Sequence, residues 1–380
     1  MRYLDTKTID YAYPYLPWQN DEGGFYFPDF SIHPFIDEAI SVTKRIFERH
    51  LETQESLSPL NRHRLLIAEP NLSWEESCNL VIEAFTDFHP KLGEKAKEVI
   101  QNQNRWKVKK TSIGEAKGCC HPANCETNST PYAIIEYEYD ETINDAVYIA
   151  HELGHLIADD FMNKAGFSYS DGKRHMNEVQ AFFTQHILYA YLSKHPDTRL
   201  KQVGQSHFIG EITRSLYSLP IGIGALEAEK AAIKNTSAVD VKTVYESVLE
   251  QWLGDRWTQY NRAVRLANEI QDPRKRDDWG ICNLHQHPMA SIIATGVFTV
   301  MHDMSANKKQ EMIDALLNLE GPKGINDIFE AICNESGLNM QQIANLSIQK
   351  IESSFDKSES SLILGPKEHR QPFVKGPSPY

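Results

Sequence analysis

The chain has 380 residues, 41% of them hydrophobic, so it can bury a large core as one big domain or two. Its formal net charge of −13, without any run of Lys and Arg, argues against a nucleic-acid-binding protein. A basic-then-apolar leader does not follow Met1, and no apolar stretch reaches the length of about 18 residues needed to span a bilayer. We therefore expect a cytoplasmic protein that does not enter the membrane.

The first part of the chain predicts several helices and a small sheet. Residues 1–30 are rich in Tyr, Pro, Phe and Gly and predict an extended segment packed on the body. Ser73 and Glu76 form a capping box, which predicts that a helix begins at residue 74. The expected elements are helices over 35–53, 74–88 and 91–103, strands over 106–108 and 132–139, and an irregular loop over 111–131.

The rest of the chain predicts helices as far as residue 353. From Ser353 onward the composition changes to Ser, Lys, Glu, Gly and Pro, so residues 354–380 are predicted to form a disordered tail. Without a long polar linker before that point, residues 1–353 are expected to form a single, mainly α domain (α+β class) with a small β-sheet. After the helix that begins near residue 143, the expected helices are 175–194, 198–218, 224–235, 239–252, 255–270, 288–303, 308–319, 325–335 and 339–353.

The sequence His-Glu-Leu-Gly-His begins at His151, inside a segment, 143–162, that carries apolar residues on nearly every face. Thr142 is the expected N-cap of this helix. His151 and His155 share a helical face and can bind one ion, whereas Glu152 is turned about 100° away and can meet a water on that ion. Chance matches to this short motif are usually found on charged surface helices. The apolar surroundings therefore favour a zinc site.

A catalytic zinc needs a third protein ligand and keeps its fourth position for water. Glu178 is the favoured third ligand, because it shares a helical face with Phe182 and should point into the core. Asp159 lies about 12 Å along the same helix from the first histidine, which is too far for one ion. His175 and His186 compete with Glu178 as ligands, and His186 is expected to be a packed histidine or one that supports a ligand.

Two further groups of residues could contribute to a site. Cys119, Cys120 and Cys125 crowd one short loop, a poor spacing for structural zinc, so we expect free thiols beside the cleft. His285 and His287 precede the helix expected at 288–303. They can project imidazole donors into a cleft, or they can be exposed loop residues.

These motifs resemble the oligoendopeptidase F and thimet oligopeptidase family of zinc peptidases. Residues 130–135 and then 145–155 are similar to the family's strand, loop and zinc helix in order and spacing, and weaker matches cover most of residues 1–350. The resemblance implies a zincin-like catalytic core of the gluzincin type with one Zn²⁺ per chain. It places His151, His155 and Glu178 as the ligands.

The sequence departs from this family at two places. Family members have a long helical N-terminal lobe, and this chain begins after that lobe would have ended, so we expect a more open cleft. In the family, tyrosines before the Ala-Thr-Gly sequence stabilise the oxyanion, whereas Met289, Ser291 and Ile293 stand there in this chain. His285 or His287 is then the expected donor. We favour His287, because a following proline biases a residue towards an extended backbone with a defined side-chain direction.

The sequence thus predicts a zinc metallopeptidase, an endopeptidase or oligopeptidase, acting on peptides or unfolded protein segments, with Glu152 as general base. The strand at 132–139 is expected to pair with an extended peptide. A binding protein that kept the fold but lost turnover and a Taq-type metallocarboxypeptidase are the alternatives. The sequence does not determine the substrate, the residue preference or the oligomeric state.

Overall fold

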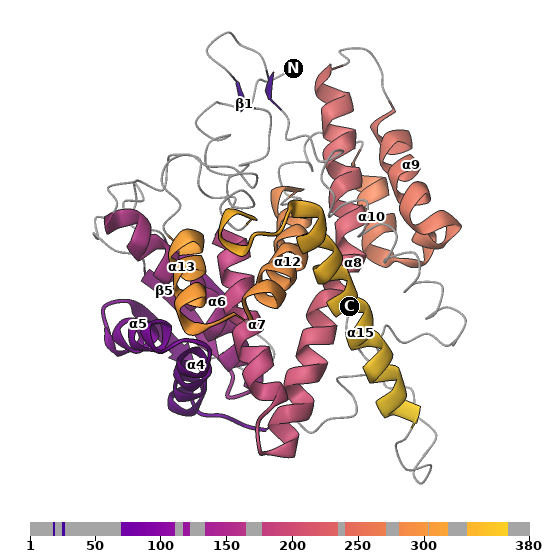
Figure 1. The fold of residues 1–380 in the computed structure, drawn as a ribbon. Helices are drawn as coiled ribbons and strands as arrows, with labels where there is room; N and C mark the ends of the chain where they lie inside the picture. Colours follow the sequence, from indigo (N-terminus) through magenta and orange to yellow (C-terminus); the bar gives the residue numbers. More distant parts are fainter. Residues whose placement is uncertain are drawn as a thin grey trace.

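Helices dominate the computed structural model, which confirms the mainly α fold class with a small sheet (Figure 1). Only β1 (Trp18–Gln19) and β2 (Phe25–Tyr26), which pair antiparallel, are described from the predicted N-terminal segment. The helix predicted at 35–53 lies outside the described residues. The structure describes residues 18–19, 25–26, 70–110, 117–121, 134–164, 177–234, 240–270, 281–302, 304–317 and 333–363.

The sheet next to the candidate site has three strands in the order β3-β5-β4. The central strand β5 (Ile134–Tyr139) runs parallel to β3 (Trp106–Lys110) and antiparallel to β4 (Lys117–His121). Both edges of β5 are therefore occupied, so the prediction that this strand pairs with a peptide is wrong. The strands β3 and β4 form the two edges of this sheet. The strand β4 lies where the sequence predicts an irregular loop, and it carries two of the crowded cysteines. Its sequence, Lys-Gly-Cys-Cys-His, lacks an apolar alternation that would reveal a strand.

Two helices beside the sheet follow their sequence signals closely. The helix α4 (Trp74–Phe88) begins at the predicted capping box, in which Ser73 N donates to Glu76 Oε2 at 2.8 Å and Glu76 N donates to Ser73 Oγ at 3.3 Å. The next helix, α5 (Pro90–Gln101), has its proline in the first turn, where a missing N–H costs nothing. These two helices cover one side of the molecule in Figure 1.

The long central helices pack on one another and carry the candidate site. The helix α7 contacts α6, α8 and α12, and α12 in turn contacts α8 and α15. A single cluster of buried hydrophobic residues extends from Cys78 to Ile351, in keeping with the single domain that we propose. No helix among the residues that the structure describes is long and apolar enough to cross a membrane. The bounds of these helices are α6 (Ile143–Lys164), α7 (Asn177–Ser193), α8 (Thr198–Lys234), α12 (Ile281–His302) and α15 (Met340–Ile363).

Several helix boundaries differ from prediction because packing outweighs local signals. The helix α8 continues through Pro220, whereas the sequence predicts two helices there. Pro220 has no backbone N–H to donate within the helix, and contacts with α7, α9 and α12 stabilise α8 despite this missing hydrogen bond. The helix α15 continues to Ile363, past the start of the predicted tail, whereas residues 364–380 lie outside the described part. The other helices are α9 (Val241–Leu253), the 3₁₀ helix η2 (Gly254–Gln259), α10 (Asn261–Glu269) and α13 (Ala306–Leu317).

Candidate metal centre

A network of hydrogen bonds starts α6 directly after the sheet. The Thr142 amide donates to Asp145 Oδ2 at 3.0 Å, and the Asn144 amide donates to Thr142 Oγ1 at 3.2 Å, so the predicted N-cap is present. The Tyr137 hydroxyl on β5 donates to Asp145 Oδ1 at 2.7 Å. Because Asp145 is buried, these bonds fix the beginning of α6 to the sheet and so set where the His-Glu-Leu-Gly-His segment lies.

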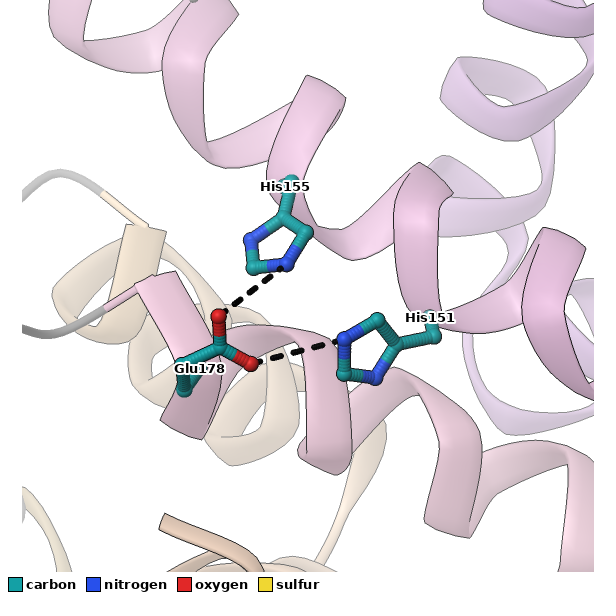
Figure 2. Close-up of side chains that lie close together, drawn as sticks. All are labelled: His151, His155 and Glu178. Atoms are coloured by element: carbon teal, nitrogen blue, oxygen red, sulfur yellow. Dashed lines mark ion pairs between the residues drawn. The ribbon is translucent and has the colours of Figure 1, made fainter. Parts of the chain in front are cut away.

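The two histidines of α6 and the carboxylate of α7 converge on one point (Figure 2). His151 Nε2 lies 3.4 Å from Glu178 Oε2, and His155 Nε2 lies 3.7 Å from Glu178 Oε1. All three candidate ligand atoms lie within 4.8 Å of one another. Ligand atoms on a tetrahedral zinc with bonds of about 2.0 Å are separated by about 3.3 Å, so this arrangement fits zinc after a small contraction.

Gly154, inside the motif, sets the distance between α6 and α7. A Cβ at this position would lie 2.7 Å from the Cα of Ala181 and would also overlap Thr184 Oγ1. Thr184 Oγ1 in turn donates to the carbonyl oxygen of Ala150 at 2.8 Å, which ties the two helices together beside the site. Glycine therefore permits the close approach that brings Glu178 to the histidines.

The electrostatics of the three residues favour positive charge between them. Burial lowers the pKa of His151, but the hydrogen bond and charge of Glu178 raise it to about 9 overall. Burial lowers the pKa of His155 to about 4, against the opposing charge of Glu178. Burial raises the pKa of Glu178, but His155, His151 and His287 together hold it well below its usual range. A half-buried carboxylate and two imidazoles of this kind are a suitable donor set for a divalent cation, which would displace the proton.

Glu152 is buried beside the ligands and faces the edge strand. Burial, the largest effect, raises the pKa of the Glu152 carboxyl, whereas the charge of His151 lowers it and the charge of Glu178 raises it. The resulting pKa is about 7. The backbone N–H of Cys120 in β4 also lowers this pKa through a hydrogen bond. The second oxygen, Oε2, has no hydrogen-bond partner among the residues that the structure describes. A carboxyl group with a pKa near neutrality can accept and release a proton at pH 7.

His287 reaches the same site, although not in the way predicted. The helix α12 begins at Ile281, so His287 and Pro288 lie within it and not before it. The extended backbone expected before the proline is absent, because α12 stays helical while it packs against α7 and α8. His287 Nε2 lies 3.1 Å from Glu178 Oε1, and its side chain is 45% exposed. His285 lies on the same helix, but its side chain is outside the described part of the structure.

The fold that carries this site matches solved peptidase structures. An oligoendopeptidase F assigned in Bacillus anthracis str. Ames is 14% identical, with a TM-score of 0.55, and the match covers 88% of this chain and 58% of that chain. PZ peptidase A, solved with an inhibitor, is 11% identical with a TM-score of 0.56, over 86% and 59% of the two chains. The chain has the fold of the oligoendopeptidase F peptidases.

A peptidase from Chlamydophila abortus is also similar to this oligoendopeptidase F fold, at 14% identity and a TM-score of 0.51, over 84% of this chain and 55% of that one. The chain thus spans well under two thirds of the length of the peptidases it matches. Comparison of the sequence with protein-family models finds no match. Comparison with curated proteins also finds none.

Within this oligoendopeptidase F fold, the middle of α12 contributes no phenol to the site. Ser291 and Ile293 are buried, in the stretch where the family that the sequence resembles carries tyrosines. His186 is also buried next to α12, with Nε2 at 3.1 Å from Thr295 Oγ1, and burial lowers its pKa to about 4. It is a packed histidine, as predicted, and does not belong to the group of candidate ligand atoms. His175 lies outside the described residues.

A separate cavity of about 210 Å³ lies between α4, α7, α12 and α13 and includes none of the candidate site residues. It is at the far end of α7, about 24 Å along the helix from Glu178 by the rise of 1.5 Å per residue. Lys194 and His302 line it, with Lys194 Nζ at 3.3 Å from His302 Nε2. Because α4, α7 and α12 all end here, the lysine offsets the partial negative charge of helix C-termini.

Proposed function

We propose that the chain is a zinc-dependent metallopeptidase in which His151, His155 and Glu178 bind one zinc ion per chain. The observation that carries this proposal is the convergence of two imidazoles and a carboxylate, at 3.4 and 3.7 Å, from two buried helices. Nitrogen and oxygen ligands of this kind suit zinc, and three protein ligands leave one position open. The similar solved structures are peptidases, which supports a peptide or an unfolded protein segment as substrate.

Glu152 is the proposed general base. A zinc ion bound by the three ligands would lower the pKa of a coordinated water towards neutrality and polarise a peptide carbonyl. The buried Glu152 carboxylate takes a proton from the attacking water and then gives it to the amine that leaves. Burial raises the pKa of this carboxyl in the metal-free protein, which increases its affinity for the proton that it takes from the water.

The edge strand β4 is the proposed binding site for the substrate backbone. Among the strands that the structure describes, only β5 pairs with β4, and the Cys120 amide already contacts Glu152. An extended peptide that pairs with the other edge would therefore run past the general base, and main-chain hydrogen bonds would supply affinity with little demand on side chains.

We propose His287 as the donor to the substrate carbonyl oxygen. In the structure its Nε2 is close to Glu178 Oε1, where a hydrogen bond can form. A cation bound by Glu178 would weaken this bond, and the N–H of the half-exposed imidazole could then turn to a substrate. His285 remains a second candidate from the sequence.

Two measurements test the proposal. The purified protein should contain about one zinc per chain by elemental analysis and, with zinc added, should cleave members of a diverse peptide library. Glu152→Gln keeps the shape and the ligands but removes the proton acceptor, so zinc should stay and cleavage should cease. Cleavage that survives in this variant would reveal a contaminating protease or a different base.

A peptide-binding protein without turnover is the second candidate function. It is favoured by the burial of Ser291 and Ile293 in α12, which leaves the imidazole of His287 to replace the tyrosines. Losing one oxyanion donor typically lowers turnover about 100- to 1000-fold. A protein that binds zinc and library peptides but cleaves none of them would establish this alternative.

A further inference from the structure

The imidazole of His151 has a second polar neighbour besides Glu178. Its Nδ1 lies 3.1 Å from Gln185 Oε1, and Gln185 Nε2 in turn donates a hydrogen bond to the hydroxyl of Tyr189. Gln185 and Tyr189 are both buried. Glu178, Phe182, Gln185 and Tyr189 follow one another at intervals of four, three and four residues, so they lie on one face of α7. That face carries both a candidate ligand and a contact to the opposite ring nitrogen of another ligand.

The amide of Gln185 fixes which nitrogen of His151 carries hydrogen. A carbonyl oxygen can only accept, so Nδ1 must donate to Oε1. A neutral imidazole has one N–H, and Nε2 therefore keeps its lone pair. That lone pair lies 3.4 Å from Glu178 Oε2, which is also an acceptor. Two acceptors at this distance need a proton or a cation between them.

Tyr189 determines which way the amide of Gln185 is turned. If the amide turned over, its NH₂ group would face His151 and donate to Nδ1. Nδ1 would then be the acceptor, and the hydrogen of the neutral imidazole would lie on Nε2. Burial and the charge of Glu211 both raise the pKa of Tyr189, so its hydroxyl keeps its hydrogen. The hydroxyl oxygen accepts the hydrogen bond from Gln185 Nε2, so this side of the amide carries the NH₂ group and the other side carries the carbonyl oxygen. Glu211 itself is held by Arg214, at 3.5 Å.

The ring of His151 is also restrained by packing. Phe182 packs against it in a T-shaped contact, with ring centroids 5.0 Å apart and planes at 78°. This contact limits rotation of the imidazole about its side-chain bonds, while the hydrogen bond to Gln185 selects the tautomer. The two effects together hold Nε2 towards Glu178.

We propose that Gln185 and Tyr189 are positioning residues for metal binding, which hold His151 as the Nδ1–H tautomer with Nε2 free to bind the ion. This inference rests on the proposed zinc site. Outer partners of metal-binding histidines typically change metal affinity about 10- to 100-fold when they are removed. Since the partner here is a neutral amide and not a carboxylate, it orients the imidazole without adding negative charge beside the site.

The test compares zinc dissociation constants, measured by competition with a chromogenic chelator. Gln185→Leu removes the acceptor and should weaken zinc binding about 10- to 100-fold. Gln185→Glu keeps an acceptor for His151 and should restore binding to within a few-fold of the parent. Tyr189→Phe keeps the ring but loses the hydroxyl, so it should weaken binding by less than Gln185→Leu. If Gln185→Leu does not fold, the other two variants carry the comparison.

Thr213→Val is the control for the loss of a buried polar group. Thr213 is buried on α8, and its hydroxyl donates to the carbonyl oxygen of Ile209 at 2.7 Å within the same helix. This variant should lower thermal stability and leave zinc affinity unchanged. An equal loss of zinc affinity in Thr213→Val and Gln185→Leu would show that the effect comes from packing and would overturn the positioning role.

A second readout is independent of zinc. Spectra of protein labelled with ¹⁵N-histidine should show His151 as the Nδ1–H tautomer above its pKa in the parent, and a mixture of tautomers in Gln185→Leu. If the parent binds zinc but Gln185→Leu binds it as tightly, this inference fails and the proposed function stands. If the parent binds no zinc, the proposed function fails. The tautomer spectra then decide only whether Gln185 selects the tautomer of His151.

Discussion

Gly154→Ala tests whether the contact between α6 and α7 sets the metal site. The new Cβ would lie 2.7 Å from the Cα of Ala181, whereas ordinary contacts begin at 3.4 Å. The helices must therefore separate by about 0.7 Å, the difference between these distances, since the atom in the way is backbone. Functional side chains need to be held within about 0.5 Å of their working geometry, so zinc affinity should fall.

The loss of stability in Gly154→Ala can also be bounded. Overpacking a buried contact costs about 1–3 kcal/mol, and the upper end applies because backbone must move. Alanine in a helix interior recovers about 1 kcal/mol relative to glycine, so the net loss is about 2 kcal/mol. Chemical denaturation measures this loss, and chelator competition measures the zinc affinity.

Gly93→Ala is the matched control, because its Cβ would lie at the same 2.7 Å from a backbone Cα, that of Thr86, but between α4 and α5. It should lose similar stability and keep parental zinc affinity. Parental zinc affinity in Gly154→Ala, in a protein whose parent binds zinc, would refute the reasoning.

Three further predictions concern single side chains. Glu178→Ala should lower zinc content while the protein stays folded, and full retention of zinc would point to another third ligand. His287→Ala should lower turnover about 100-fold or more with zinc content little changed, measured as kcat on a cleaved peptide. Asp160→Asn removes the carboxylate that lies 2.9 Å from both Lys95 Nζ and Arg105 Nη2. It should cost about 3 kcal/mol at pH 7 in urea unfolding, the lower end of the range for a broken buried pair, because the buried Arg105 loses this carboxylate while the half-buried Lys95 keeps Glu98 at 3.1 Å. Burial raises the pKa of Asp160, but Arg105 and Lys95 lower it overall. The stabilisation by Asp160 is therefore present above the unfolded pKa of about 3.9 and is lost as the pH falls through the folded pKa. The stability of Asp160→Asn should depend less on pH in the acid range than that of the parent. An unchanged pH dependence would count against this role of Asp160.

Local sequence signals determined the features that depend on neighbouring residues. The capping box of Ser73 and Glu76 marked the start of α4, because both hydrogen bonds form within one turn. The four-residue spacing of His151 and His155 placed both imidazoles on one face of α6, since helix geometry alone sets that direction. Glu178 was recognised by its position on a core-facing stripe. The same stripe, continued by seven residues, contains Gln185, which no sequence motif marks as a site residue.

Tertiary contacts decided the features that local preference leaves open or opposes. The strand β4 exists through its pairing with β5 and has no alternation of its own. The helix α12 includes His287 despite the proline that follows, and α8 runs through Pro220, because neighbouring helices stabilise each backbone. The meeting of Glu178 with the two histidines depends on the approach of α7 to α6 at Gly154. A sequence specifies which face of a helix is apolar, but the distance between two faces is set only when their side chains pack together.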